Sequence, residues 1–148
     1  MTEQEKPVKP GQIPSDMKAF NEGVITEFRA NGGRLSGPMA ESRVLLLTTT
    51  GATSGRSRTT VVGYRTDGDR YLVIASNNGA VLHPAWYRNL LADPVATVEV
   101  GAEKFKARAT TAEPGERDEL AARIDYLERQ QKLTQREIPI VILERLGT

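Results

Sequence analysis

The sequence predicts a single α+β domain: a small, mostly antiparallel six-stranded barrel with about three helices packed around it. The strand-like segments follow one another as hairpins with short glycine-containing turns, without the strand–helix alternation of a parallel sheet. Six short strands also leave edges, which closure into a barrel removes. The length of 148 residues suits one domain, so we expect a flexible tail over residues 1–14 and the folded domain over residues 15–148.

The composition is that of a globular chain without disulfide or metal chemistry. Hydrophobic residues make up 39% and charged residues 26% of the chain. There is no cysteine and His83 is the only histidine, so no metal site is expected. A net charge of +1 gives no bulk attraction to nucleic acid. The sequence shows no signal peptide and no transmembrane run. We therefore expect a cytoplasmic protein, with peripheral membrane contact left open.

Hydrophobic spacing predicts three helices. Met17, Phe20, Val24 and Phe28 recur at helical spacing and indicate a first helix over about residues 16–31. A short helix is predicted in "HPAWYRNLLADP", where the proline suits the first helical position. A second long helix is predicted in "EPGERDELAARIDYLERQQ", whose apolar residues form one stripe.

Six apolar or alternating segments predict the strands of the barrel. They are "RVLLLTTT", "TTVVGYRT", "RYLVIAS", "VATVEV", "KFKARATT" and "IPIVILE". Two tight turns, "DGD" with Gly68 and "GAE", join neighbouring segments into hairpins.

The glycine loop "TTTGATSGRSRTT" follows the first strand and is the first candidate site. The spacing of its glycines matches neither a Walker loop, nor a dinucleotide fingerprint, nor a hydrolase elbow. Its glycines still allow backbone N–H groups to form an anion nest. The side chains that add hydroxyl or guanidinium donors are Thr53, Ser54, Ser57, Arg56 and Arg58. An ordinary solvated loop is the alternative interpretation.

The second candidate site is "ASNNGAVLHPAWYRNL". Here a strand runs into two asparagines and a glycine, and then into a proline-started helix with free N–H groups at its start. Trp86 either packs in the core or forms one wall of a ligand pocket. His83 is interpreted as a polar residue near the helix start rather than a catalytic base. Tyr126, further along the chain, is a candidate proton donor or pocket wall, with simple packing as the alternative.

The two motifs "TTTGxxSGxxRTT" and "HPAWYxNLxAxP", in this order and followed by "REIPIVILE", resemble a known family. This is the deazaflavin (F420)-dependent nitroreductase and F420H2-dependent quinone reductase family, whose members are split β-barrel proteins. The resemblance runs from about Val44 to the C-terminus. It implies an enzyme that transfers a hydride from reduced coenzyme F420 to a small-molecule acceptor such as a quinone or nitroaromatic compound.

The resemblance also implies which residues bind the cofactor. The glycine loop would hold its phosphate and acidic tail, the following strand would approach the ribityl chain or ring, and the second motif would line the ring. The implied residues are Thr53, Ser54, Gly55, Arg56, Ser57, Arg58, Thr59, Val61, Ala75, Ser76, Asn77, Asn78, Trp86 and Asn89. This chain departs from its relatives at Ala52 and Thr53, where they often carry basic residues. Tyr126 also lies at a shifted place, so activation of nitro-prodrugs is not expected from the resemblance.

The residues alone leave two other functions open. The same barrel and anion nest would also hold FMN or FAD. The alternative that is not an enzyme is a non-catalytic protein that carries a cofactor or a lipid-like ligand. The sequence permits either a monomer or a homodimer.

Overall fold

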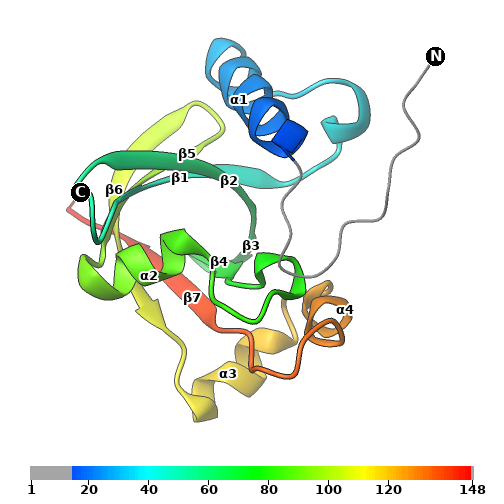
Figure 1. Cartoon of the computed structure of the whole chain (residues 1–148), viewed down its shortest axis with the longest axis vertical. Coiled ribbons are helices and arrows are strands. Elements are labelled where there is room, and N and C mark those ends of the chain that lie inside the picture. The colour runs from blue at the N-terminus through cyan, green and yellow to red at the C-terminus, as the bar shows by residue number, and fades with distance from the viewer. Residues whose placement is uncertain (1–14, 148) are drawn as a thin grey trace.

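The computed structural model describes residues 15–147; the predicted tail over residues 1–14 lies outside this part of the chain. Its strands form one antiparallel sheet, curled into a half-barrel with helices around it (Figure 1), and this confirms the predicted fold class. The strands are β1 (Val44–Thr50), β2 (Ser57–Gly63), β3 (Arg65–Asp67), β4 (Arg70–Ile74), β5 (Val95–Val100), β6 (Glu103–Thr111) and β7 (Ile140–Arg145). The α-helices are α1 (Ser15–Ala30), α2 (Ala85–Ala92), α3 (Pro114–Ala121) and α4 (Leu127–Gln131), with 3-10 turns η1 (Gly37–Met39) and η2 (Asn77–Gly79).

The sheet has the strand order β2-β1-β5-β6-β7-β4-β3, so two consecutive strands lie at opposite edges. The segment predicted as one strand, "TTVVGYRT", breaks at Tyr64. Gly63 pairs with Val44 of β1, whereas Arg65 pairs with Leu72 of β4. The Tyr64 N–H donates instead to the carbonyl of residue 43 at 3.1 Å. This break raises the number of strands in the described chain from the six expected to seven, and it leaves the barrel split between β2 and β4.

The main core fills the inside of the curl. Its strand residues alternate along each strand, because successive side chains of a strand point to opposite faces of the sheet. Helix α2 adds two residues that complete the core. Its buried residues are Leu45, Leu47, Val73, Ala75, Tyr87, Leu90, Ala96, Val98, Phe105, Ala107, Ala109, Val141 and Leu143.

A second core lies between α3, α4 and the other face of β4 and β7. Its buried residues are Leu72, Ile74, Leu120, Ile124, Leu127, Ile138, Ile140 and Ile142. The predicted long helix over residues 113–131 is wrong in one respect, because the chain leaves helical geometry between α3 and α4. Short-range bonds replace the α-helical ladder there, such as Ile124 N–H to the Ala121 carbonyl at 3.1 Å. The bend keeps all three apolar residues of the predicted stripe buried and turns Tyr126 toward the sheet.

Helix α1 packs on the outer side of the sheet near β2 and β5 (Figure 1). Phe28 and Val24, two of the residues that predicted it, are only 2% and 6% exposed. Arg29 adds a bidentate ion pair to the buried Glu99 of β5, with N–O distances of 3.0 and 2.8 Å. The helix found by periodicity is therefore both an apolar cover and an electrostatic partner of the barrel.

Candidate active site

A cavity of about 240 Å³ opens at the split between β2 and β4, and we call it the cleft. Four segments that are distant in the sequence form its walls: β2, the end of β4 with η2, helix α2, and the start and middle of α4. The lining residues are Val61, Val62, Gly63, Ile74, Ser76, Asn77, Trp86, Tyr126 and Gln130. Five of them, Val61, Ser76, Asn77, Trp86 and Tyr126, are among the residues predicted from the sequence to form the site.

The cleft combines apolar side chains from β2, β4 and α2 with polar side chains from η2 and the α4 segment, and two of the polar atoms are buried. Tyr126 Oη and Gln130 Oε1 have no hydrogen-bond partner among residues 15–147. Burial raises the pKa of Tyr126, so its phenol is protonated at neutral pH. A buried polar atom without a partner is rare and costly, and it marks a place where a ligand can bind.

The turn η2 reaches the cleft in a strained backbone conformation. Asn77 has φ of 48°, a left-handed value that few residues other than glycine adopt. Its side chain donates to the Leu82 carbonyl at 3.0 Å, which ties the turn to the loop that follows it.

Arg136, four residues before β7, stabilises this turn through its guanidinium group. Its guanidinium donates to the carbonyls of Ala75, Ser76 and Ala80 at 2.8–3.0 Å, and to His83 Nδ1 at 2.9 Å. His83 therefore accepts at Nδ1 and is neutral in this arrangement. Burial lowers the pKa of His83, and the neighbouring cations Arg136 and Arg88 lower it further. This geometry agrees with the expectation that His83 is not a catalytic base.

The glycine loop lies beyond the cleft, at the far end of β2. Its residues from Ala52 to Arg58 are exposed, and a bond from the Gly51 N–H to the Arg56 carbonyl at 2.8 Å closes it. Val61 in the cleft follows Arg58 by three positions along the strand, or roughly 10 Å at about 3.3 Å per residue. Only an elongated molecule can contact both the loop and the cleft.

Asn89 of α2 anchors the start of this loop. The buried amide accepts from the Ala52 N–H at 2.9 Å and donates to Thr49 Oγ1 at 3.0 Å. Among the other predicted residues, Thr59 shares a hydrogen bond with Thr48, and Ala75 lies in the main core without lining the cleft. Of Asn78 only the backbone is described, within η2.

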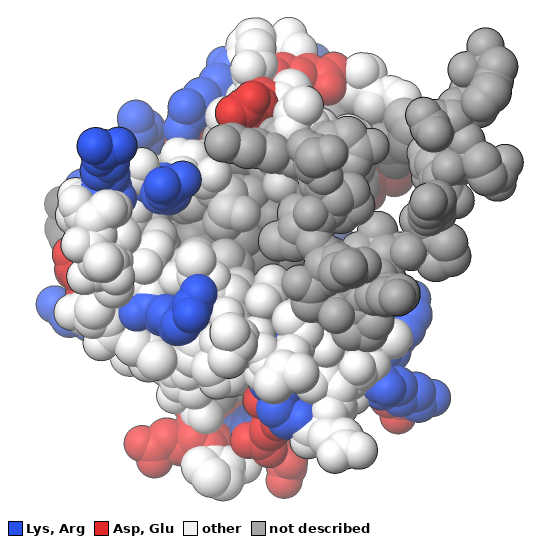
Figure 2. Space-filling model, viewed as in Figure 1, with Lys and Arg blue, Asp and Glu red and all other residues white. Residues whose placement is uncertain are grey.

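Charge is unevenly distributed around the molecule. In Figure 2, lysines and arginines are most numerous on the left of the face shown, with others at the right and the lower edge, and acidic residues lie at the lower edge and near the top. Both basic residues of the glycine loop, Arg56 and Arg58, are exposed. An anionic group bound at the loop would therefore meet these guanidinium groups directly.

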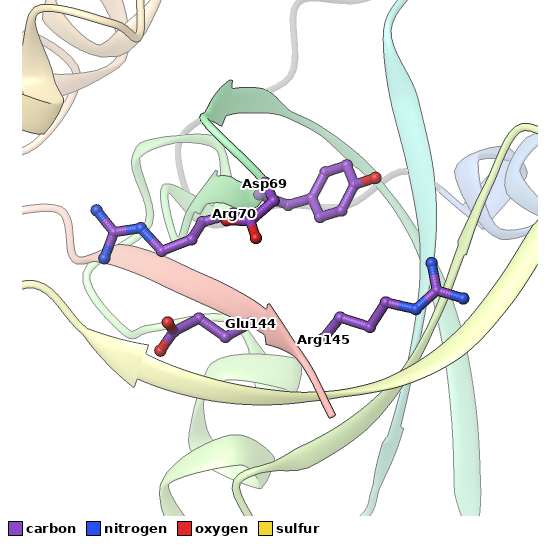
Figure 3. Close-up of a pocket in the computed structure, with 5 residues that line it drawn as sticks. Asp69, Arg70, Glu144 and Arg145 are labelled. Atoms are coloured by element: carbon purple, nitrogen blue, oxygen red, sulfur yellow. The ribbon is translucent and has the colours of Figure 1, made fainter. Parts of the chain in front are cut away.

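A second cavity of about 240 Å³ lies near the β3–β4 turn and the end of β7 (Figure 3). Its two arginines already have protein partners. Arg70 pairs with Asp67 and Glu116, and Arg145 stacks over the Phe105 ring with its guanidinium carbon 4.4 Å from the centroid. In Figure 3, Arg70 and Glu144 extend to one side while Arg145 extends to the other, so these groups do not converge on a common point.

Sequence reasoning missed Gln130, Gly63 and Arg136. Gln130 stands among several polar residues of the α4 segment, and nothing in the pattern separates it from them. Arg136 had a signal, since it is a cation two residues before the buried Ile138 and four residues before β7. Gly63 also had one, because it interrupts a strand-like run at the place where the strand breaks.

The split antiparallel barrel, with a cleft at its open edge and a basic glycine loop alongside, suits a protein that binds an elongated anionic cofactor. Residues 23–145 match the model of a family described as F420H(2)-dependent quinone reductase. The chain therefore belongs to the F420H(2)-dependent quinone reductase family, a family of oxidoreductases whose cofactor is coenzyme F420.

Individual relatives agree with this assignment. An F420H(2)-dependent quinone reductase of Mycobacterium tuberculosis is 38% identical over 110 residues, covering 68% of this chain and 72% of that protein. A solved F420-H2 dependent reductase, FDR-A, is 31% identical with a TM-score of 0.61, covering 69% of this chain and 94% of that chain. A solved domain-swapped dimer is 27% identical with a TM-score of 0.63, covering 88% of this chain and 100% of that chain. The prediction of F420 rather than FMN or FAD, and of an enzyme rather than a carrier, is confirmed by the family.

Proposed function

We propose that this chain binds coenzyme F420 with the ring in the cleft and the anionic tail toward the glycine loop, and reduces a quinone there. The carrying observation is the separation of roughly 10 Å between the cleft and the loop along one edge strand. The cleft also fits a ring system chemically. Its walls combine apolar and polar side chains, and the unsatisfied Tyr126 Oη and Gln130 Oε1 offer hydrogen bonds to polar atoms on the ring edge.

Each wall has a proposed task. Ser76 and Asn77 form the wall on one side of the ring. Arg136 holds the Ser76 carbonyl, and the Asn77 side chain is held by the Leu82 carbonyl. Trp86 of α2 closes the cleft as an aromatic wall. At the far end of β2, Arg56 and Arg58 neutralise the anionic portion, helped by hydroxyls and N–H groups of the loop.

When bound, reduced F420 supplies a hydride, so the protein must position the acceptor and manage its protons. A quinone that takes up a hydride also needs a proton on its oxygen to become a quinol. Tyr126 is the candidate donor, because it lines the cleft and its protonated hydroxyl has no partner among the described residues.

The test of this function begins with fluorescence titration of the purified protein with F420. We expect binding at micromolar concentration or tighter. Arg58→Ala should weaken binding by about 1.5–3 kcal/mol, the range of a charge-assisted hydrogen bond. Arg108→Ala, at an exposed arginine on β6, is the matched control and should leave affinity unchanged. Absence of F420 binding, or of quinone turnover with reduced F420, would refute the proposal.

We further propose that the protein acts on a small-molecule acceptor in the cytoplasm, as a monomer or homodimer. No helix within residues 15–147 is long and apolar enough to cross a membrane. The domain-swapped dimer among the similar structures supports a homodimer, since it shares most of this chain. Light scattering after size-exclusion chromatography would distinguish the two assemblies.

A further inference from the structure

Two buried polar atoms of the residues that line the cleft differ from the other buried polar side chains, because they have no hydrogen-bond partner among the described residues. Buried Asn89 has both amide atoms bonded, and buried Glu99 has both oxygens bonded to Arg29. Tyr126 Oη and Gln130 Oε1 have no hydrogen-bond partner among residues 15–147, although both are buried. Because unsatisfied buried groups destabilise a fold, their presence in a cavity calls for a ligand-based explanation.

The two groups come from successive turns of the chain and face the same cavity. They are four residues apart, and the Gln130 N–H donates to the Tyr126 carbonyl at 3.2 Å, so they lie on one side of α4. Both side chains therefore line the cleft from the same element, one with a hydroxyl and the other with an amide oxygen. One can donate a hydrogen bond, and the other accepts one.

Tyr126 is held in its orientation by neighbours on the edge strands. The Arg65 guanidinium carbon lies 4.7 Å from the ring centroid, and Arg65 Nε is fixed to Asp125 Oδ1 at 2.8 Å. Gly63 of β2 lies next to the hydroxyl: a Cβ added there would make an ordinary van der Waals contact with Tyr126 Oη at 3.6 Å. These contacts hold the ring at the wall of the cleft before any ligand arrives.

We propose that Tyr126 and Gln130 form a two-point site for a ring that carries either a carbonyl oxygen next to an N–H group or a hydroxyl group. Tyr126 donates to the carbonyl or hydroxyl oxygen, and Gln130 Oε1 accepts from the neighbouring N–H or from the hydroxyl itself. Val61, Val62 and Trp86 supply the apolar surface against the rest of the ring. This inference rests on the proposed function, and it specifies which edge of a ligand the cleft recognises.

Two molecules of the proposed reaction carry this chemistry. The imide edge of a deazaflavin has an N–H between two carbonyls. The reduced acceptor has O–H groups, which the quinone itself lacks. Both present a donor to Gln130 Oε1, so matched probes that differ only in that donor separate the two sources.

The first pair of probes is 5-deazariboflavin and its N3-methyl derivative. The second is 1,4-naphthohydroquinone, handled without oxygen, and 1,4-dimethoxynaphthalene. Trp86 is the only tryptophan in the chain and lines the cleft, so quenching of its fluorescence reports binding there. We expect wild-type protein to prefer the donor-bearing member of at least one pair by about 5- to 100-fold, the equivalent of one good hydrogen bond.

The variant Gln130→Met keeps the size of the side chain and removes its acceptor. It should abolish the preference within the pair that uses Gln130. It should also raise the melting temperature of the ligand-free protein by about 2–6 °C, because an unsatisfied buried group is removed. Tyr126→Phe should weaken both members of that pair to a similar extent, since the oxygen that accepts from Tyr126 remains in each.

Gln131→Met is the matched control. The neighbouring Gln131 has both amide atoms bonded, to the Arg136 carbonyl at 2.6 Å and to the Ile138 N–H at 3.0 Å. This variant should lower the melting temperature and leave the probe preference unchanged. If Gln130→Met does not fold, Gln130→Asn shortens the reach of the amide and should lose the preference in its place.

The outcomes separate this inference from the proposed function. Loss of the preference in the deazariboflavin pair assigns the site to the cofactor, and loss in the hydroquinone pair assigns it to the acceptor. Equal binding within both pairs by wild-type protein would overturn the inference even if F420 binds. So would a preference that survives Gln130→Met. Failure of F420 to bind would refute the proposed function. The inference about Tyr126 and Gln130 would still be decided separately, by the probe preferences and the melting temperatures.

Discussion

Asn89 is a buried polar side chain at the junction of α2, β1 and the glycine loop. Its amide oxygen holds the Ala52 N–H and its amide nitrogen holds Thr49 Oγ1, so the start of the loop is tied to a helix. It is 8% exposed, and the loop residues beyond it are exposed. We therefore expect Asn89 to influence cofactor binding through the shape of the loop.

Asn89→Ala should lower the free energy of unfolding by about 1–3 kcal/mol, because it leaves a backbone N–H and a buried hydroxyl without their partner. Urea unfolding monitored by circular dichroism measures the change. Arg88→Ala, at the exposed neighbour on the same helix, should change stability by no more than about 0.5 kcal/mol. Equal effects of the two substitutions would contradict the anchoring role.

The single histidine predicts a pH dependence of stability. The pKa of His83 is lowered in the fold by burial and by Arg136 and Arg88, and the edge of the Tyr87 ring packs against it. In the unfolded chain it takes up a proton near pH 6.5. As pH falls below about 6.5, the unfolded state therefore binds a proton that the folded state does not, and stability decreases until the folded-state pKa is reached.

His83→Asn should remove this part of the pH dependence. The asparagine oxygen can accept from Arg136 where Nδ1 does, and it does not titrate. Urea unfolding at several pH values between 5 and 8, for both proteins, measures the difference. Parallel curves for the two proteins would show that His83 does not contribute.

At the scale of elements, the 3-10 turn η2 and the segment after α4 pack closely against each other. A Cβ added at Gly79 would lie 2.6 Å from Leu133 Cβ and 3.0 Å from the Leu133 carbonyl. Gly79 also has φ of +79°, which favours glycine. The turn that bounds the cleft and the helix that carries Tyr126 and Gln130 are thus fitted to each other through one glycine.

Gly79→Ala should lower the free energy of unfolding by about 1–3 kcal/mol, because it adds both overlap and backbone strain. Gly115→Ala is the matched control: it lies in α3, with open space around an added Cβ. This control should be neutral or stabilising by up to about 1 kcal/mol. Thermal unfolding of both variants measures the contrast, and a tolerated Gly79→Ala would contradict the close fit.

At the scale of the whole molecule, α1 and the barrel are joined by an apolar contact and one charged contact. Phe28 and Val24 are buried, and Glu99 has a buried carboxylate whose partner is Arg29. A carboxylate that loses its partner in such a place is costly. The ion pair therefore ties the first helix of the described chain to a central strand of the sheet.

A double-mutant cycle with Arg29→Met and Glu99→Gln measures this connection. We expect a coupling free energy of about 1–2 kcal/mol, below that of a fully buried pair because the Arg29 side chain is 47% exposed. The ion pair of Arg145 and Glu103, which is exposed on both sides, is the control and should couple by less than about 1 kcal/mol. Equal coupling in the two cycles would contradict this account.

Local sequence signals predicted most elements but not the two breaks that create the cleft. The hairpins and the periodic helix α1 follow from residue spacing, which depends on neighbours along the chain. The strand break at Tyr64 and the bend before Tyr126 depend on which distant segment each half packs against. The same holds for Gln130 and Arg136, whose roles come from elements more than 50 residues away. Five residues of the cleft were predicted because they lie within recognisable motifs.

The order of the strands also has a consequence for how the protein folds. Hairpins β1–β2 and β5–β6 join neighbours in the chain, whereas β4 and β7 join residues as far apart as Tyr71 and Leu143. Contacts between distant residues form late in folding. The cleft draws on both kinds of segment, so it is completed only after the last strand docks. We expect backbone amides around the cleft to exchange hydrogen faster than those in the hairpins. A bound cofactor should slow this exchange, because it contacts the strands on both sides of the cleft.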